Sequence, residues 1–214
     1  MSVVAQLTGV SKRFRGRAVL EDVDLTVAQG ACIAVQGPNG SGKSVLFKII
    51  CGFVRPDSGS VHINPRYLDP RNSFPQEFGV LIDRPGYLPH RTGFDNLQSL
   101  AAIRGRIGEQ EIVAAMERVG LDPGLSQRVA HYSLGMKQKL ALAQSFMEGQ
   151  SVLLLDEPFN GLDESSVARV AALLESFLNE GRTLVFTSHQ QADVDRLARQ
   201  RYRIDAGRLL QQTA

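Results

Sequence analysis

A glycine-rich stretch in the first quarter of the chain carries the residues best suited to bind phosphate. The apolar segment Ala31 to Gln36 precedes it, and the apolar run Val45 to Cys51 continues from its end. Glycines let the backbone turn tightly so that successive N–H groups point into one concavity, and a helix that starts there adds the positive end of its dipole. The stretch therefore predicts a site for the phosphates of a nucleotide, the alternative being a glycine-rich turn without a ligand. It reads Gly37, Pro38, Asn39, Gly40, Ser41, Gly42, Lys43, Ser44 and Val45.

Two side chains at the end of this stretch can contact the nucleotide in addition to the backbone N–H groups. The Lys43 ammonium can reach the β- and γ-phosphates of a bound nucleotide, and the Ser44 hydroxyl can ligate Mg²⁺. We therefore assign the whole stretch to ATP binding, Lys43 also to catalysis, and Ser44 also to the metal.

Two acidic residues directly follow another apolar segment. Asp156 and Glu157 come after Val152 to Leu155, whose lack of polar alternation indicates a strand covered on both faces. Open α/β sheets bind ligands at the carboxyl ends of such strands. Asp156 is therefore a candidate to hold Mg²⁺ opposite Ser44, and Glu157 to polarise the attacking water. The alternative is that both acids cap the following turn.

A histidine follows a further apolar segment in the same way. His189 comes after Thr183 to Thr187 and would lie at the same sheet edge as the two acids. We assign it a catalytic contact with the γ-phosphate or the attacking water, although a lone histidine at such a place is more often structural.

These residues need a sheet whose strands end at one edge, and the pattern of the chain predicts such a sheet. Apolar segments recur at Ala31 to Gln36, Phe78 to Ile82, Val152 to Leu155 and Thr183 to Thr187, with helical stretches between them. Ser165 to Asn179, for example, places its apolar residues on one helical face. The alternation is typical of an α/β fold with a mostly parallel core sheet.

The remaining segments predict two additions to that core. Residues from about 93 to 150 are nearly all helical in pattern, which indicates a helical subdomain inserted over about 84–150. Val3 to Thr8 with Leu20 to Val27 predicts an antiparallel β subdomain, and Tyr202 to Gln211 predicts a further hairpin.

Composition sets limits on the class of protein. A length of 214 residues suits a single domain, 1–214, with a well-buried core. A net charge of +2, from 24 basic and 22 acidic residues, does not favour binding to nucleic acid through charge alone. Cys32 and Cys51 each lie in an apolar stretch, which predicts buried thiols and no disulfide.

No apolar run approaches the roughly 20 residues that span a bilayer, and the amino end lacks the order of a signal peptide. We therefore expect a cytoplasmic protein.

A short motif ahead of the two acids identifies a family. Tyr132-Ser133-Leu134-Gly135-Met136, followed by Lys137-Gln138-Lys139-Leu140, resembles the signature of ABC ATPases, and its Met136 lies 20 positions before Asp156. Asn160-Gly161-Leu162-Asp163 resembles the family's D-loop. Phe14 falls where an aromatic usually stacks on adenine, the alternative being a position in the core. The resemblance extends over nearly the whole chain.

The resemblance implies a working dimer. In ABC ATPases the signature of one subunit closes over the nucleotide held by the phosphate loop of the other. By this analogy Ser133, Gly135 and Asp163 contact nucleotide, as Phe14 does. The partners implied are a second ATPase subunit and a separately encoded transmembrane permease, which would hold the protein at the inner face of the cell membrane.

Two departures from the family pattern narrow the resemblance. Asp83 stands where most of the family has glutamine, and we assign it to the metal through water. Leu134 and Met136 replace the commoner glycine and glutamine of the signature. This form of the signature, together with Ile82-Asp83-Arg84-Pro85-Gly86-Tyr87, is similar to that of one branch of the family. That branch is associated with bacitracin- and lantibiotic-type antibiotic-peptide export or immunity. The resemblance implies an ATPase that powers export of a peptide, antibiotic or other small hydrophobic compound.

Two other functions fit parts of the pattern. A soluble ABC protein could act as a switch on ribosomes or DNA, but such proteins usually carry two cassettes or a long coiled coil. A haem-export type subunit has a similar length, but the Met136-Lys137-Gln138 form argues against it. The sequence leaves the transported molecule and its direction open, because the permease recognises the cargo.

Overall fold

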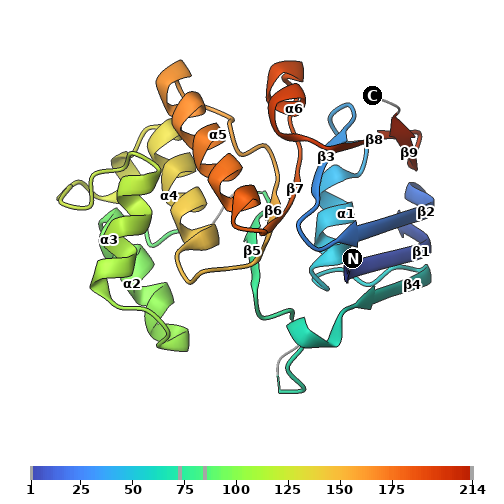
Figure 1. Cartoon of the computed structure of the whole chain (residues 1–214), viewed down its shortest axis with the longest axis horizontal. Helices are drawn as coiled ribbons and strands as arrows, with labels where there is room; N and C mark the ends of the chain where they lie inside the picture. Colours follow the sequence, from blue (N-terminus) through green and yellow to red (C-terminus); the bar gives the residue numbers. More distant parts are fainter. Residues whose placement is uncertain (1, 72–73, 84–85, 213–214) are drawn as a thin grey trace.

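The centre of the protein, whose computed structural model describes residues 2–71, 74–83 and 86–212, is a six-stranded sheet (Figure 1). Neighbouring strands are parallel except for the last pair, which is antiparallel. The predicted mostly parallel core sheet is therefore confirmed. In spatial order the strands are β5 (Phe78–Leu81), β6 (Val152–Leu155), β7 (Thr183–Phe186), β3 (Cys32–Gln36), β8 (Gln200–Asp205) and β9 (Arg208–Gln212).

Both faces of this sheet are covered, which explains why β6 lacks polar residues. All residues of β6 and β7 are buried. Successive side chains point to opposite faces, so Leu153 and Leu155 enter one hydrophobic core and Val152 and Leu154 enter the other. Cys32 is buried and free, as predicted, and so is Cys51; burial raises the pKa of both thiols to about 12.

A second, antiparallel sheet packs over one of these cores. Its spatial order is β2 (Arg17–Ala28), β1 (Val3–Phe14) and β4 (Ser58–Ile63). The hairpin of β1 and β2 is longer than the sequence pattern indicated, because Arg13 pairs with Ala18 and Phe14 with Arg17. That end is rich in charged residues, so the period of two on which the prediction depended is lost there.

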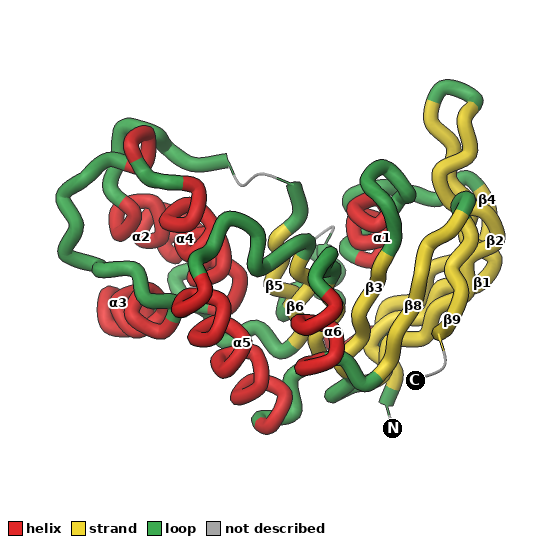
Figure 2. Tube along the Cα trace, turned by 90° about the horizontal axis from the view of Figure 1, so that it is seen from above, coloured by secondary structure: helices red, strands yellow, loops and turns green. Residues whose placement is uncertain are grey.

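In the described ranges, six α-helices surround the sheets (Figures 1 and 2). They are α1 (Lys43–Ile50), α2 (Gly93–Arg104), α3 (Glu109–Arg118), α4 (Leu134–Phe146), α5 (Glu164–Asn179) and α6 (Gln191–Leu197). Helix α1 shares a core with the antiparallel sheet, whereas α2, α3 and α4 gather on the opposite side of the molecule. This arrangement confirms the predicted inserted helical region. None of the helices in the described ranges is long and apolar enough to cross a membrane.

Helix α2 begins and ends at residues suited to those positions. The Thr92 hydroxyl accepts a hydrogen bond from the Asp95 N–H at 3.1 Å, and the Asp95 carboxylate accepts one from the Thr92 N–H at 3.3 Å. This reciprocal cap satisfies two N–H groups that the helix leaves free. Gly105 ends the helix with a φ of 61°, a conformation that costs glycine little.

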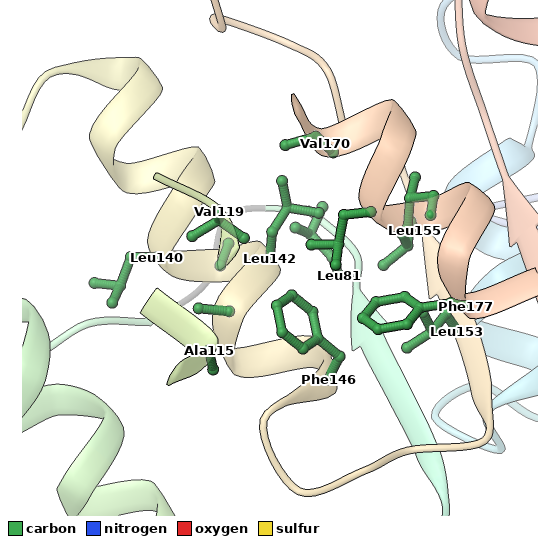
Figure 3. Close-up of a cluster of buried hydrophobic side chains, with 14 of the residues drawn as sticks. Leu81, Ala115, Val119, Leu140, Leu142, Phe146, Leu153, Leu155, Val170 and Phe177 are labelled. Atoms are coloured by element: carbon green, nitrogen blue, oxygen red, sulfur yellow. The ribbon is translucent and has the colours of Figure 1, made fainter. Parts of the chain in front are cut away.

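The helical region and the central sheet share one core, drawn in Figure 3. Phe146 of α4 and Phe177 of α5 lie with ring centroids 5.1 Å apart, next to Leu153 of β6. This continuous core packs α4 against the central sheet.

Gly79 is the point of closest approach between β5 and α4, and it yields a stability prediction. A Cβ atom added there would lie 1.7 Å from the backbone oxygen of Ser145, so Gly79→Ala must push α4 off the sheet. We expect the free energy of unfolding, measured in urea, to fall by about 1–3 kcal/mol. Gly86→Ala is the matched control, because an added Cβ there meets nothing within 4 Å. Equal losses in the two variants would contradict the prediction.

Candidate functional site

The glycine-rich loop joins the end of β3 to the start of α1, as a phosphate site requires. Helix α1 begins after Gly42, whose φ is 110° and which supplies no side-chain cap, so N–H groups of the first turn remain free. A Cβ atom at Gly42 would lie 2.9 Å from the backbone oxygen of Val19, and one at Gly37 would lie 2.8 Å from that of Ile204. Only glycine fits these two positions.

The polar groups of this loop suit an anionic ligand. Lys43 is buried, and its Nζ donates hydrogen bonds to the backbone oxygens of Gly37 at 2.7 Å and Pro38 at 3.2 Å. The Ser41 hydroxyl is buried and has no hydrogen-bond partner among the described residues. A buried cation and an unsatisfied hydroxyl beside free N–H groups are what a phosphate group would satisfy.

Asp156 joins the carboxyl ends of separate strands. The Ser44 hydroxyl donates a hydrogen bond to Oδ2 of Asp156, and the Thr187 hydroxyl donates one to Oδ1 at 2.7 Å. Ser44 follows β3, and Thr187 directly follows β7. The pair of oxygens from Ser44 and Asp156 is the hard donor set that Mg²⁺ prefers, so these residues fit a metal at the phosphate loop. Sequence reasoning missed Thr187, although its position at a strand end was a usable signal.

Glu157 lies at a strained turn directly after Asp156. Its φ is 51°, a left-handed conformation that costs a residue with a side chain about 1–3 kcal/mol. The Glu157 N–H donates a hydrogen bond to the Thr187 hydroxyl at 2.8 Å. Oε1 of Glu157 lies 3.2 Å from Nε2 of His189, which is half exposed. The carboxylate of Glu157 thus lies beside the histidine.

A cavity of about 380 Å³ gathers most of the predicted residues. It is lined by both acids and His189 together with the phosphate loop and β2. The remaining lining residues are Val19, Asn39, Gly40, Gly42, Lys43, Ser44 and Val45. A phosphate chain in this cavity would face the carboxylates directly. The cavity thus brings together residues predicted to bind phosphate, to ligate metal and to activate water.

The signature segment lies outside this cavity, at the start of α4. The Ser133 hydroxyl accepts a hydrogen bond from the Met136 N–H at 3.2 Å and so caps the helix. Gly135 packs against the D-loop, because a Cβ atom there would lie 2.8 Å from the backbone oxygen of Gly161. Leu134 is 61% exposed. In a single copy, Ser133 and Gly135 are not next to the phosphate loop.

Asp83 has a partner other than the predicted metal ligands. Its φ is 56°, and its Oδ2 lies 2.5 Å from Nζ of Lys48 on α1. It lines a neighbouring cavity of about 680 Å³ that also reaches Asp156 and Glu157. The metal role of Asp83 stays a prediction.

Phe14 is not a core residue. Its side chain is 46% exposed at the end of β1, with the Lys12 ammonium 5.4 Å from the ring centroid. The core alternative is therefore wrong, because the hairpin carries the ring beyond the packed part of the sheet. Stacking on adenine stays a prediction.

Asp163 is the cap of α5. Its Oδ1 accepts hydrogen bonds from the Ser166 N–H at 2.8 Å and from the Ser165 hydroxyl at 2.9 Å. The Ser166 backbone N–H, followed by the hydroxyls of Ser166 and Ser165, lowers the pKa of Asp163 to about 2. If Asp163 contacts nucleotide as predicted, it does so with a carboxylate that also caps the N-terminus of α5.

Comparison with known proteins places these features in a family context. The ABC transporter family model matches residues 20–160. The uncharacterized ABC transporter ATP-binding protein YybJ of Bacillus subtilis (strain 168) is 34% identical over 95% of this chain and 94% of its own length. The lantibiotic transport ATP-binding protein SrtF of Streptococcus pyogenes is 33% identical over 90% of this chain and 83% of its own. The bacitracin transport ATP-binding protein BcrA of Enterococcus faecalis is 30% identical over 92% and 65%.

A solved structure confirms the predicted fold. The dimeric post-hydrolysis state of the ATP-binding cassette MJ0796, bound to ADP and Pi, superposes with a TM-score of 0.87 over 98% of both chains. The two sequences are 20% identical, so this likeness concerns the fold alone.

The charged cap at Asp163 predicts a pH dependence of stability. Because its pKa is lower in the folded protein, its ionised form stabilises the fold fully above about pH 4 and loses that effect as pH falls toward 2. We expect Asp163→Asn to lower the urea midpoint at pH 7 and the difference from the parent protein to narrow below pH 4. A difference that stays constant from pH 7 to pH 3 would contradict this assignment.

Proposed function

Because the chain belongs to the ABC transporter family of ATP-binding proteins, we propose that it is the subunit whose ATP hydrolysis powers export of a peptide, antibiotic or other small hydrophobic compound. The observation that carries the proposal is the meeting of Ser44, Asp156 and Glu157 at one sheet edge beside the phosphate loop. The names of the lantibiotic and bacitracin relatives support the class of cargo.

The loop residues bind the phosphates of ATP in this proposal. The N–H groups of the loop and the first turn of α1 surround the phosphate oxygens, and Lys43 turns from the backbone oxygens of Gly37 and Pro38 to the β- and γ-phosphates. Ser44 and Asp156 hold Mg²⁺, which when bound neutralises phosphate charge. Phe14 offers its exposed ring face to adenine.

Glu157 activates the attacking water. Its carboxylate accepts a hydrogen bond from the water and draws off the proton as the oxygen approaches the γ-phosphorus. His189, 3.2 Å away, lies beside the same cavity and contacts the γ-phosphate. Asp156 stays with the two hydroxyls that hold it, so the two neighbouring acids have different tasks.

Two copies complete each nucleotide site. The Ser133 hydroxyl accepts from the Met136 N–H and keeps its own proton for donation to a phosphate oxygen. Free N–H groups at the start of α4 make a second anion site of the same kind as the phosphate loop. We propose that this half-site closes over ATP held by the other copy, and that hydrolysis releases the pair.

The membrane partner is a permease encoded separately, which holds the protein at the cytoplasmic face of the membrane. Its contact surface includes the segment from Asp83 to Asn96, of which residues 86–96 and Asp83 are described. Leu88 there is 41% exposed, and Leu81, Tyr87 and Pro89 line the cavity of about 680 Å³ between sheet and helices. An apolar groove with an exposed leucine suits a short helix of the permease.

The proposed chemistry is tested by Glu157→Gln, which keeps the shape of the side chain and removes the acid. We expect the rate of phosphate release from ATP to fall about 100-fold or more, because a general base contributes that much. The same variant should accumulate as an ATP-bound dimer on size-exclusion chromatography. Glu117→Gln, at an exposed acid of α3, is the matched control. Undiminished hydrolysis by the Glu157 variant would refute the assigned mechanism.

A further prediction concerns the permease surface. Leu88→Asp should move the protein several-fold from the membrane fraction to the supernatant of lysed cells that express the whole transporter, because the new charge opposes apolar docking. Its affinity for ATP should not change. Ile103→Asp, at a 76% exposed residue near the far end of α2, controls for an added surface charge. Equal redistribution of both variants would argue against docking at Leu88.

A further inference from the structure

The backbone of Glu157 is held from both sides by side chains. Its N–H donates to the Thr187 hydroxyl at 2.8 Å. Its carbonyl oxygen accepts a hydrogen bond from Nε2 of Gln138 at 3.0 Å, and Nε2 also donates to the carbonyl oxygen of Pro158 at 3.0 Å. Thr187 comes from the end of β7 and Gln138 from α4, so two distant elements fix one peptide segment.

The conformation of Glu157 makes these contacts consequential. Its φ of 51° is unfavourable for a residue with a side chain and persists only when surrounding contacts enforce it. The direction of the carboxylate depends on that backbone conformation. The Gln138 amide is suited to enforce it, because its NH₂ group supplies donors to two adjacent carbonyl oxygens.

Gln138 lies on the same helix as the signature. The first turn of α4 carries Ser133 as its cap and Gly135, which packs against the backbone of Gly161. One turn further along, Gln138 reaches the backbone at Glu157 and Pro158. A shift of α4 relative to the central sheet would therefore move the donors that fix Glu157.

We propose that Gln138 and Thr187 are positioning residues for Glu157, and that Gln138 makes the orientation of this carboxylate depend on the position of the signature helix. The inference rests on the proposed role of Glu157 in activating water. In a dimer, α4 would contact the ATP held by the other copy at its first turn and, through Gln138, set the carboxylate that acts on its own ATP. The two hydrolysis sites are thereby linked within each chain.

The test of Gln138 uses the isosteric variant Gln138→Glu, which replaces the donor by an acceptor facing two carbonyl oxygens. We expect kcat of the purified full chain for ATP to fall about 10-fold or more, with KM, the Kd for ATP and ATP-dependent dimerisation changed less than twofold. Gln144→Glu on the same helix is the matched control and should keep the parent kcat. An unchanged kcat, or an equal loss of ATP affinity or dimerisation, would overturn the positioning role.

Thr187 allows a rescue experiment. Thr187→Val removes the hydroxyl at nearly constant volume, whereas Thr187→Ser keeps it. We expect the valine variant to lose kcat about 10-fold or more and the serine variant to stay within threefold of the parent protein. Loss of activity in both variants alike would contradict a role for the hydroxyl.

Combination with Glu157→Gln separates this inference from the proposed function. When Glu157 is replaced, Gln138→Glu should cause no further fall in the residual hydrolysis, because the group that it positions is gone. A further 10-fold fall would overturn the inference and leave the role of Glu157 intact. Undiminished hydrolysis by Glu157→Gln alone would instead refute the proposed function.

Discussion

The functional edge of this protein depends on one carboxylate shared by two hydroxyl groups. Asp156, directly after β6, accepts hydrogen bonds from Ser44 in the first turn of α1 and from Thr187, directly after β7. Hydrogen bonds to an ionised acceptor are stronger than those between neutral groups. Because β6 and β7 are neighbouring parallel strands, their carboxyl ends lie side by side at this acceptor. The phosphate loop, the acids and the histidine are thereby held at one edge.

Glu157, next to Asp156, has a left-handed backbone conformation, and the two neighbouring acids have different partners. Glu157 adopts a left-handed backbone and directs its carboxylate toward His189. Such a conformation persists only where other contacts enforce it. Here they come from the sheet through Thr187 and from the helical region through Gln138. The helical region thus helps to hold the turn at Glu157 and also shares a core with the sheet.

Residues at the edges of the site already have partners within a single copy. Asp83 is paired with Lys48, Asp163 caps α5, and Ser133 caps α4. Asp163 and Ser133 accept backbone N–H groups and Asp83 pairs with an ammonium group, so any role toward nucleotide or metal must be combined with these contacts. Phe14 differs, because its ring is exposed at the end of a hairpin.

The sequence by itself determined the α/β alternation, the phosphate loop and the acids at a strand end, because each of these follows from the order of neighbouring residues. It also placed Cys32 and Cys51 in the core. Only the tertiary structure decided that Thr187 bridges Asp156 and Glu157, that Gln138 holds the strained turn, and that β1 continues to Phe14. These contacts join residues far apart in the chain, and their geometry depends on how α4 packs on the sheet, which no local pattern records.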